Sequence, residues 1–133
     1  MANYQVYYHK MRNYHWNVEG SDFFELHEEF ENEYNDAKIK IDDLAERIRV
    51  FGIRPTMTMP EILKISEIDE TTEKLSAYEM VKEVLKDYQV LHELMLDVVN
   101  AALETGDIGT ENLIAENILA LEKRHWMFSS WIK

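Results

Sequence analysis

One apolar repeat, which spans residues 23–51, constrains the fold more than any other feature of the sequence. Its side chains recur every third or fourth residue: Phe23, Leu26, Phe30, Tyr34, Ala37, Ile41, Leu44, Ile48 and Phe51. This is the period of an amphipathic α-helix, here of about eight turns. Gly52 follows, where a glycine commonly ends a helix. Asp22-x-x-Glu25 precedes the repeat and predicts a capping box.

The same period predicts three further long helices. We expect them at about residues 2–17, after Ser76 as far as Gly106, and from Thr110 to Ile132. Ser76-x-x-Glu79 is a second capping-box pattern, and Thr110 is the expected cap of the last helix. Residues 60–65 predict a short helix within the long crossover that joins the second long helix to the third. The pattern therefore predicts an all-α four-helix bundle with a short extra helix.

Composition limits the size, the surroundings and the partners of this fold. A chain of 133 residues with 46% hydrophobic residues and only six Gly and Pro fits one helical domain, residues 1–133. The net charge of −12 disfavours nucleic acid and anionic lipid but is compatible with cations. The chain has no cysteine, no apolar run of the roughly 20 residues that a membrane helix needs, and no signal-peptide pattern. A cytoplasmic location is therefore expected.

Two pairs of potential metal ligands lie beside the apolar stripe of residues 23–51. His27 and Glu31 are four residues apart, as are Asp42 and Glu46. At about 100° per residue all four side chains fall in one sector of the helix. Side chains at i and i+4 can hold one ion together. The midpoints of the two pairs are nevertheless roughly 22 Å apart along the helix axis, so one chain offers two half-sites.

The half-sites can meet if two copies of this helix pack antiparallel around a two-fold axis near residues 36–37. His27 and Glu31 of one copy would then face Asp42 and Glu46 of the other, and one contact would make two identical sites. His15, near the end of the preceding helix, could add a nitrogen. Nitrogen and oxygen ligands without thiolate suit iron, manganese or zinc. The alternative at this point is an ordinary solvated acidic face with incidental histidines.

The remaining histidines and the tryptophans fit structural roles. His92 and His125 fall within apolar stripes and are expected in the core, whereas His9 is expected at the surface. Glu122-x-x-His125 is a spacing found in di-iron bundles, but a complete centre inside one bundle needs two such motifs and two further glutamates. The tryptophans are interpreted as core or interface aromatics: Trp16, Trp126 and Trp131.

The segments "YHWNVEGSDFFELHEEFENEY" and "DDLAERI" resemble the Dps family, the mini-ferritins named as DNA-binding proteins from starved cells. "GIRPTMTMPEIL" resembles the loop and short helix of that family, and "GDIGTENLIAENILALEKRHWMFSSW" resembles its last turn and helix. The resemblance covers nearly the whole chain. It implies a ferritin-like bundle that assembles as a hollow dodecamer and stores Fe(III) as a mineral.

The resemblance also implies a ferroxidase centre across the two-fold interface. His15 of one copy, with Asp42 and Glu46 of the other, would hold the tighter of two irons. The weaker site would belong to His27 and Glu31. Zinc or manganese can substitute for iron. Hydrogen peroxide would be the preferred oxidant, and its consumption would protect the cell against oxidative stress. By this resemblance, Trp16 lies beside the centre and can supply or relay an electron.

Three acids near the start of the last helix resemble the carboxylates that line a pore in this family and draw in Fe(II): Asp107, Glu111 and Glu116. Asn112 stands where relatives are expected to carry an aspartate, and favourable contacts with the helix dipole are an equal explanation for these acids. The first helix looks short for the family and no basic N-terminal tail is visible, so DNA binding is not expected. A DNA-compacting protein and a metal-binding bundle without oxidase activity are the alternative functions.

Overall fold

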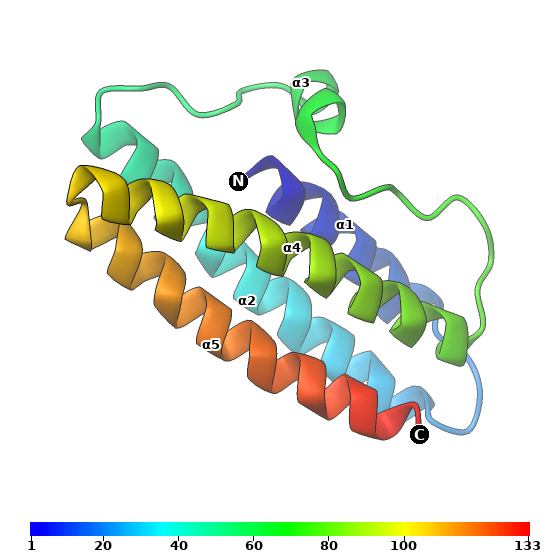
Figure 1. Cartoon of the computed structure of the whole chain (residues 1–133). Helices are drawn as coiled ribbons and strands as arrows, with labels where there is room; N and C mark the ends of the chain where they lie inside the picture. Colours follow the sequence, from blue (N-terminus) through cyan, green and yellow to red (C-terminus); the bar gives the residue numbers. More distant parts are fainter. The chain divides into compact units, whose positions relative to one another are not determined.

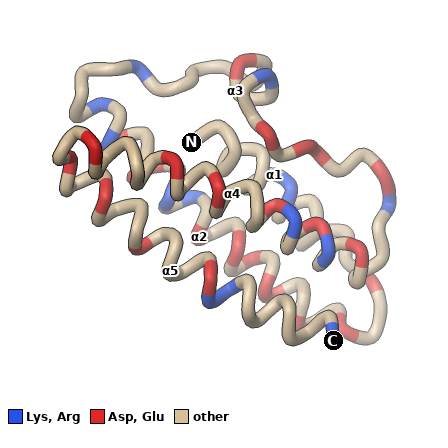
Figure 2. Tube along the Cα trace, viewed as in Figure 1, with Lys and Arg blue, Asp and Glu red and all other residues tan.

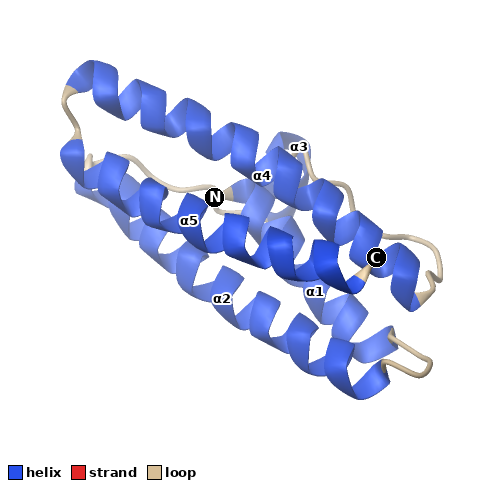
Figure 3. Cartoon of the chain, turned by 60° about the horizontal axis from the view of Figure 1, so that its bottom comes forward, coloured by secondary structure: helices blue, strands red, loops and turns tan.

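The computed structural model describes all 133 residues and contains five helices and no strand (Figures 1 and 3). They are α1 (Ala2–Asn17), α2 (Phe23–Val50), α3 (Met59–Ile65), α4 (Ala77–Thr105) and α5 (Ile108–Trp131). The predicted all-α class and the four long helices are confirmed. Internal contacts divide the chain into two compact units, residues 1–80 and 81–133, which are described in turn.

In the first unit, α1 and α2 form an antiparallel hairpin. Tyr7 of α1 contacts Glu33 of α2, and the rings of Tyr14 and Phe30 pack at a tilt of 60° with centroids 5.6 Å apart. Residue numbers thus rise along one helix as they fall along the other. The short turn between the helices contains Gly20, whose φ of 118° is a conformation that other residues rarely adopt. The hairpin places the end of α1 beside the first turns of α2, where the candidate ligands lie.

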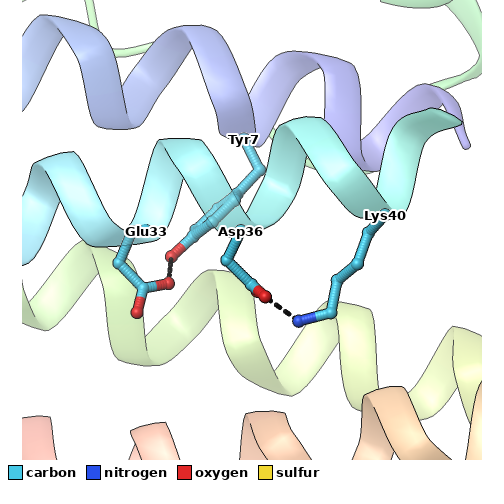
Figure 4. A network of polar contacts seen from close by, with 4 residues as sticks. All are labelled: Tyr7, Glu33, Asp36 and Lys40. Atoms are coloured by element: carbon cyan, nitrogen blue, oxygen red, sulfur yellow. Dashed lines mark hydrogen bonds and ion pairs between the residues drawn. The ribbon is translucent and has the colours of Figure 1, made fainter.

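The buried side of α2 contains two charged residues that the apolar repeat does not predict. Its buried residues are Leu26, Phe30, Glu33, Ala37 and Lys40. The Tyr7 hydroxyl donates a 2.6 Å hydrogen bond to Glu33, and Lys40 pairs with Asp36 one turn away (Figure 4). These contacts offset the free energy that burying a charged group costs when it is removed from water. Tyr34 and Ile41, expected in the stripe, are only half-buried.

The crossover after α3 is attached to α1 at several points. The side-chain oxygen of Asn3 accepts hydrogen bonds from the backbone N–H groups of Glu67 and Ile68 at 2.8 and 3.2 Å. Farther along, the hydroxyls of Tyr14 and Thr71 lie 2.6 Å apart. The chain therefore runs along α1 from its first turn towards its last. A segment of low helical content is held in place by side chains of the hairpin.

The helix ends confirm one predicted cap and correct two. Ser76 and Glu79 form the expected capping box, with the Ser76 N–H donating to Glu79 at 2.8 Å. In the second unit, α5 begins at Ile108 and its cap is Asp107, which accepts from the Thr110 N–H at 3.0 Å; the assignment of Thr110 as the cap was wrong. The Asp22 side chain makes no cap bond, because its backbone does not have the extended conformation of a capping residue.

Acidic residues are spread along α2, α4 and α5, and basic residues are fewer (Figure 2). The first helix, α1, carries no acid. No helix is long and apolar enough to cross a membrane.

Candidate metal centre

Two histidines join the end of α1 to the second turn of α2 through reciprocal hydrogen bonds. The Nδ1 atom of His15 lies 2.7 Å from the backbone carbonyl of His27, and the Nδ1 atom of His27 lies 2.8 Å from the carbonyl of His15. The two rings stack with centroids 3.7 Å apart. His15 is in the last turn of α1, where backbone carbonyls lack a helical partner. The His27 ring therefore satisfies one of these carbonyls while it is itself held in place.

These bonds decide which ring nitrogen is available to a ligand. A carbonyl oxygen only accepts hydrogen bonds, so Nδ1 of each ring must carry the proton. In the neutral imidazole the Nε2 atom then has a free lone pair. A metal-binding histidine usually donates its other ring N–H to a carbonyl or a carboxylate in this way. His15 is buried and His27 is half-buried, so both rings are preorganised before any ion arrives.

The predicted carboxylates lie on the same uninterrupted helix as His27. Glu31, Asp42 and Glu46 are all exposed on α2. The Tyr34 hydroxyl donates to Glu31 Oε1 at 3.3 Å, and its ring packs edge-on against His15 with centroids 5.4 Å apart. Partial burial and the Glu31 carboxylate raise the pKa of Tyr34, which keeps this phenol a donor at neutral pH.

Tyr34 contacts two of the candidate ligands, Glu31 and His15, and the sequence interpretation missed it. It was assigned to the apolar stripe of α2, although its spacing of three residues from Glu31 was a usable signal. Within one chain, no three His, Cys, Asp or Glu side chains gather closely enough to hold one ion. The structure thus brings His15, His27, Glu31 and Tyr34 together on one chain.

Other predicted residues lie elsewhere. Trp16 is 57% exposed and the Arg12 guanidinium sits 4.8 Å from its ring centre, so this tryptophan is not in the core. Trp126 is likewise exposed and Trp131 is half-buried. His9 is exposed, as expected.

The prediction that His92 and His125 pack in the core was wrong. Both are half-buried and line a pocket between α4 and α5 within the second unit. The Nε2 atom of His92 lies 3.2 Å from Glu122 Oε1. An apolar stripe at helical spacing did not distinguish a core position from the wall of an open pocket.

The candidate pore acids lie around the start of α5. Asp107 has a local role, since its carboxylate accepts hydrogen bonds from the N–H and the hydroxyl of Thr110. Glu111 is half-buried, and Glu116 and Asn112 are exposed. The pore remains a prediction.

Comparison with known proteins identifies the family. The ferritin-like domain family matches residues 1–133. The chain is 36% identical to DNA protection during starvation protein 2 of Bacillus anthracis over 99% of its own length and 90% of that protein's length. The chain belongs to the Dps family. Among solved structures, the Dps protein of Bacillus brevis matches with a TM-score of 0.97 and 38% identity, covering 99% of this chain and 89% of that one.

A second solved structure links the Dps fold to iron chemistry. The Dps protein of Vibrio cholerae O1 matches with a TM-score of 0.96 and 40% identity, over 99% of this chain and 83% of that chain. That protein is described as a member of a broad superfamily of ferritin-like diiron-carboxylate proteins. The predicted ferritin-like fold of this chain is thereby confirmed, and its Dps membership makes iron binding the activity to consider.

Proposed function

We propose that this Dps-family protein is a ferroxidase and iron store. Fe(II) is its substrate, and two ions bind at each centre shared by two copies of the chain. His15, His27 and Glu31 come from one copy, and Asp42 and Glu46 from the other. Hydrogen peroxide is the oxidant, and the Fe(III) product is stored inside a hollow dodecamer. The cytoplasmic location expected from the sequence remains part of this proposal.

The observation that carries the proposal is the reciprocal bond between His15 and His27. Each ring donates its Nδ1 proton to a backbone carbonyl at 2.7 or 2.8 Å, which leaves both Nε2 lone pairs for a metal ion. Imidazole nitrogens together with carboxylate oxygens suit Fe(II), and the anionic oxygens of Glu31, Asp42 and Glu46 stabilise the Fe(III) product more than they stabilise Fe(II).

The second copy follows from distance. The two ligand pairs of α2 are roughly 22 Å apart along one helix, whereas a metal–ligand bond is about 2 Å. In an antiparallel contact between two α2 helices, His27 and Glu31 of one copy face Asp42 and Glu46 of the other copy. The carboxylates suit this role because they are exposed on the single chain and free to meet another surface.

The reaction balances as two one-electron oxidations. Two Fe(II) ions each give one electron, the O–O bond of hydrogen peroxide breaks, and two protons are taken up, which yields two Fe(III) ions and two water molecules. Holding both ions together lets peroxide receive both electrons in one encounter, so hydroxyl radical is not released. When only one ion is bound, we expect Trp16 to supply the second electron; its position next to His15 in the chain and its exposure support this role.

Fe(II) oxidation by peroxide, followed through the near-ultraviolet absorbance of Fe(III), tests the proposal. The His15→Asn variant keeps a nitrogen donor two bonds from Cβ, as Nδ1 is, but removes Nε2. It and the Asp42→Asn/Glu46→Gln variant should each oxidise Fe(II) about tenfold more slowly or worse, since even partners of metal ligands contribute about 10–100-fold. His9→Ala is the matched control and should match the parent.

Unchanged rates in both ligand variants would refute the ferroxidase centre. Binding of Fe(II) without any oxidation would favour the alternative of a metal-binding bundle without oxidase activity. The second alternative, DNA compaction, is disfavoured by the net charge of −12 per chain, which repels phosphate.

A further inference from the structure

The pocket between α4 and α5 is lined by side chains of types that can bind metal ions, far along the sequence from the candidate ferroxidase residues. It is a cavity of about 280 Å³ and is lined by Tyr88, Gln89, His92, Glu93, Leu121, Glu122 and His125. Two imidazoles and two carboxylates thus face a single space, and no Lys or Arg side chain lines it. The ferroxidase proposal uses none of these residues.

Two of the ligand atoms already have the spacing that one ion requires. The Nε2 atom of His92 and the Oε1 atom of Glu122 are 3.2 Å apart. An ion about 2.1 Å from each atom would subtend an angle of about 100° between them, which lies between the octahedral and tetrahedral values. As it stands, this contact is a hydrogen bond that Nε2 donates to the carboxylate. An ion would replace that hydrogen bond, with the imidazole proton on Nδ1 and with the Nε2 lone pair and the carboxylate facing the same ion.

The accessibility of these groups favours a partly hydrated ion over a fully enclosed one. The side chains of His92 and Glu122 are 33% and 56% exposed. The cavity has room for several waters beside an ion, given about 30 Å³ per water in the liquid. His125 lies three residues after Glu122 on the same face of α5, and its Nδ1 atom lies 3.5 Å from the Ser129 hydroxyl.

We propose that His92 and Glu122 bind a hydrated divalent first-row cation, such as Zn²⁺, Mn²⁺ or Fe²⁺, with water completing its coordination. Imidazole ligation selects these ions over Mg²⁺ and Ca²⁺, which prefer oxygen. The ion would join α4 to α5, because one ligand comes from each helix. Binding to the folded state alone would then stabilise this helix pair as the ion concentration rises.

Calorimetric titration with Zn²⁺ separates this site from the ferroxidase centre when it uses a chain in which all five proposed ferroxidase ligands are replaced: His15→Asn, His27→Asn, Glu31→Gln, Asp42→Asn and Glu46→Gln. We expect one ion per chain to remain, with an affinity about tenfold weaker or worse after the further change His92→Ala or Glu122→Gln. Glu122→Gln replaces an exposed carboxylate with an amide of the same shape, so the fold should be retained. His9→Ala is the matched histidine control, and excess Mg²⁺ should not displace the bound ion.

The outcomes are decisive in either direction. Equal Zn²⁺ binding in the His92→Ala, Glu122→Gln and His9→Ala variants would overturn the proposal. So would the absence of any bound Zn²⁺ in the chain with the five ferroxidase substitutions alone, or displacement of the ion by Mg²⁺. The visible spectrum of bound Co²⁺ provides a readout that does not depend on iron oxidation: it should change in His92→Ala and stay the same in His9→Ala.

Discussion

Subunit complementation tests whether each ferroxidase centre takes its ligands from two copies of the chain. One type of chain carries His15→Asn and the other carries Asp42→Asn/Glu46→Gln. Each type alone has no intact centre, since every centre lacks part of its ligand set. In a mixed pair, one of the two centres collects both damaged half-sites and the other collects both intact ones. Mixing two inactive proteins should therefore restore activity.

The expected recovery can be calculated from the symmetry. When equal amounts of the two chains associate at random, about half of the two-fold contacts are mixed, and one of the two centres at each mixed contact is intact, so about a quarter of wild-type activity should return. The same fraction holds in a larger assembly, because each two-fold contact is formed from a random pair. Co-expression with two different tags, followed by the peroxide assay and native mass spectrometry, measures the activity and the composition together.

A matched control uses two damaged residues from the same half-site. His15 and His27 are bound to each other within one chain, so a mixture of His15→Asn and His27→Asn chains leaves every centre short of one imidazole. That mixture should stay inactive. Mixed assemblies that contain both chain types in the first experiment and yet show only the summed activity of the parents would refute the shared centre.

Three further predictions concern stability and DNA. Tyr7→Phe removes the donor to the carboxylate of Glu33 where both side chains are buried (2% and 4% exposed), so urea unfolding should show a loss of about 1.5–3 kcal/mol; a loss near zero would contradict the importance of this bond. Asp107→Ala should cost about 1 kcal/mol as the loss of the α5 cap, and a larger cost for Thr110→Val would restore Thr110 as the cap. In a gel-shift assay at low salt without divalent metal, the chain should not retard DNA, because its net charge is −12; strong retardation would show that charge does not decide the matter.

Local sequence signals were sufficient for most of the fold. The period of three to four residues placed α2 to within one residue of its end, and the Gly52 and Gly106 stops coincide with positive φ values of 75° and 70°. The Ser76 capping box was predictable because all its partners lie within one turn. The Asp22 box failed because a capping bond depends on backbone angles that the residue types alone do not impose.

The sequence predicted which residues are candidate ligands, but not which nitrogen of each imidazole carries the proton. Spacing showed that His27 and Glu31 could cooperate and that Asp42 and Glu46 were too far away on the same helix. Only the folded hairpin revealed that His15 and His27 exchange hydrogen bonds, because the partner of each ring is a backbone carbonyl twelve residues away. The position of each imidazole proton follows from that contact.

By itself, the sequence determined which residues share a helix face, because that depends on neighbours three or four positions apart. The tertiary structure decided what each face meets. Glu33 is buried where Tyr7 of α1 donates a hydrogen bond to it, and His92 lines a pocket that Glu122 of α5 also lines. A helical period contains no information about these partners, since they are brought to the site by chain segments that the period does not connect.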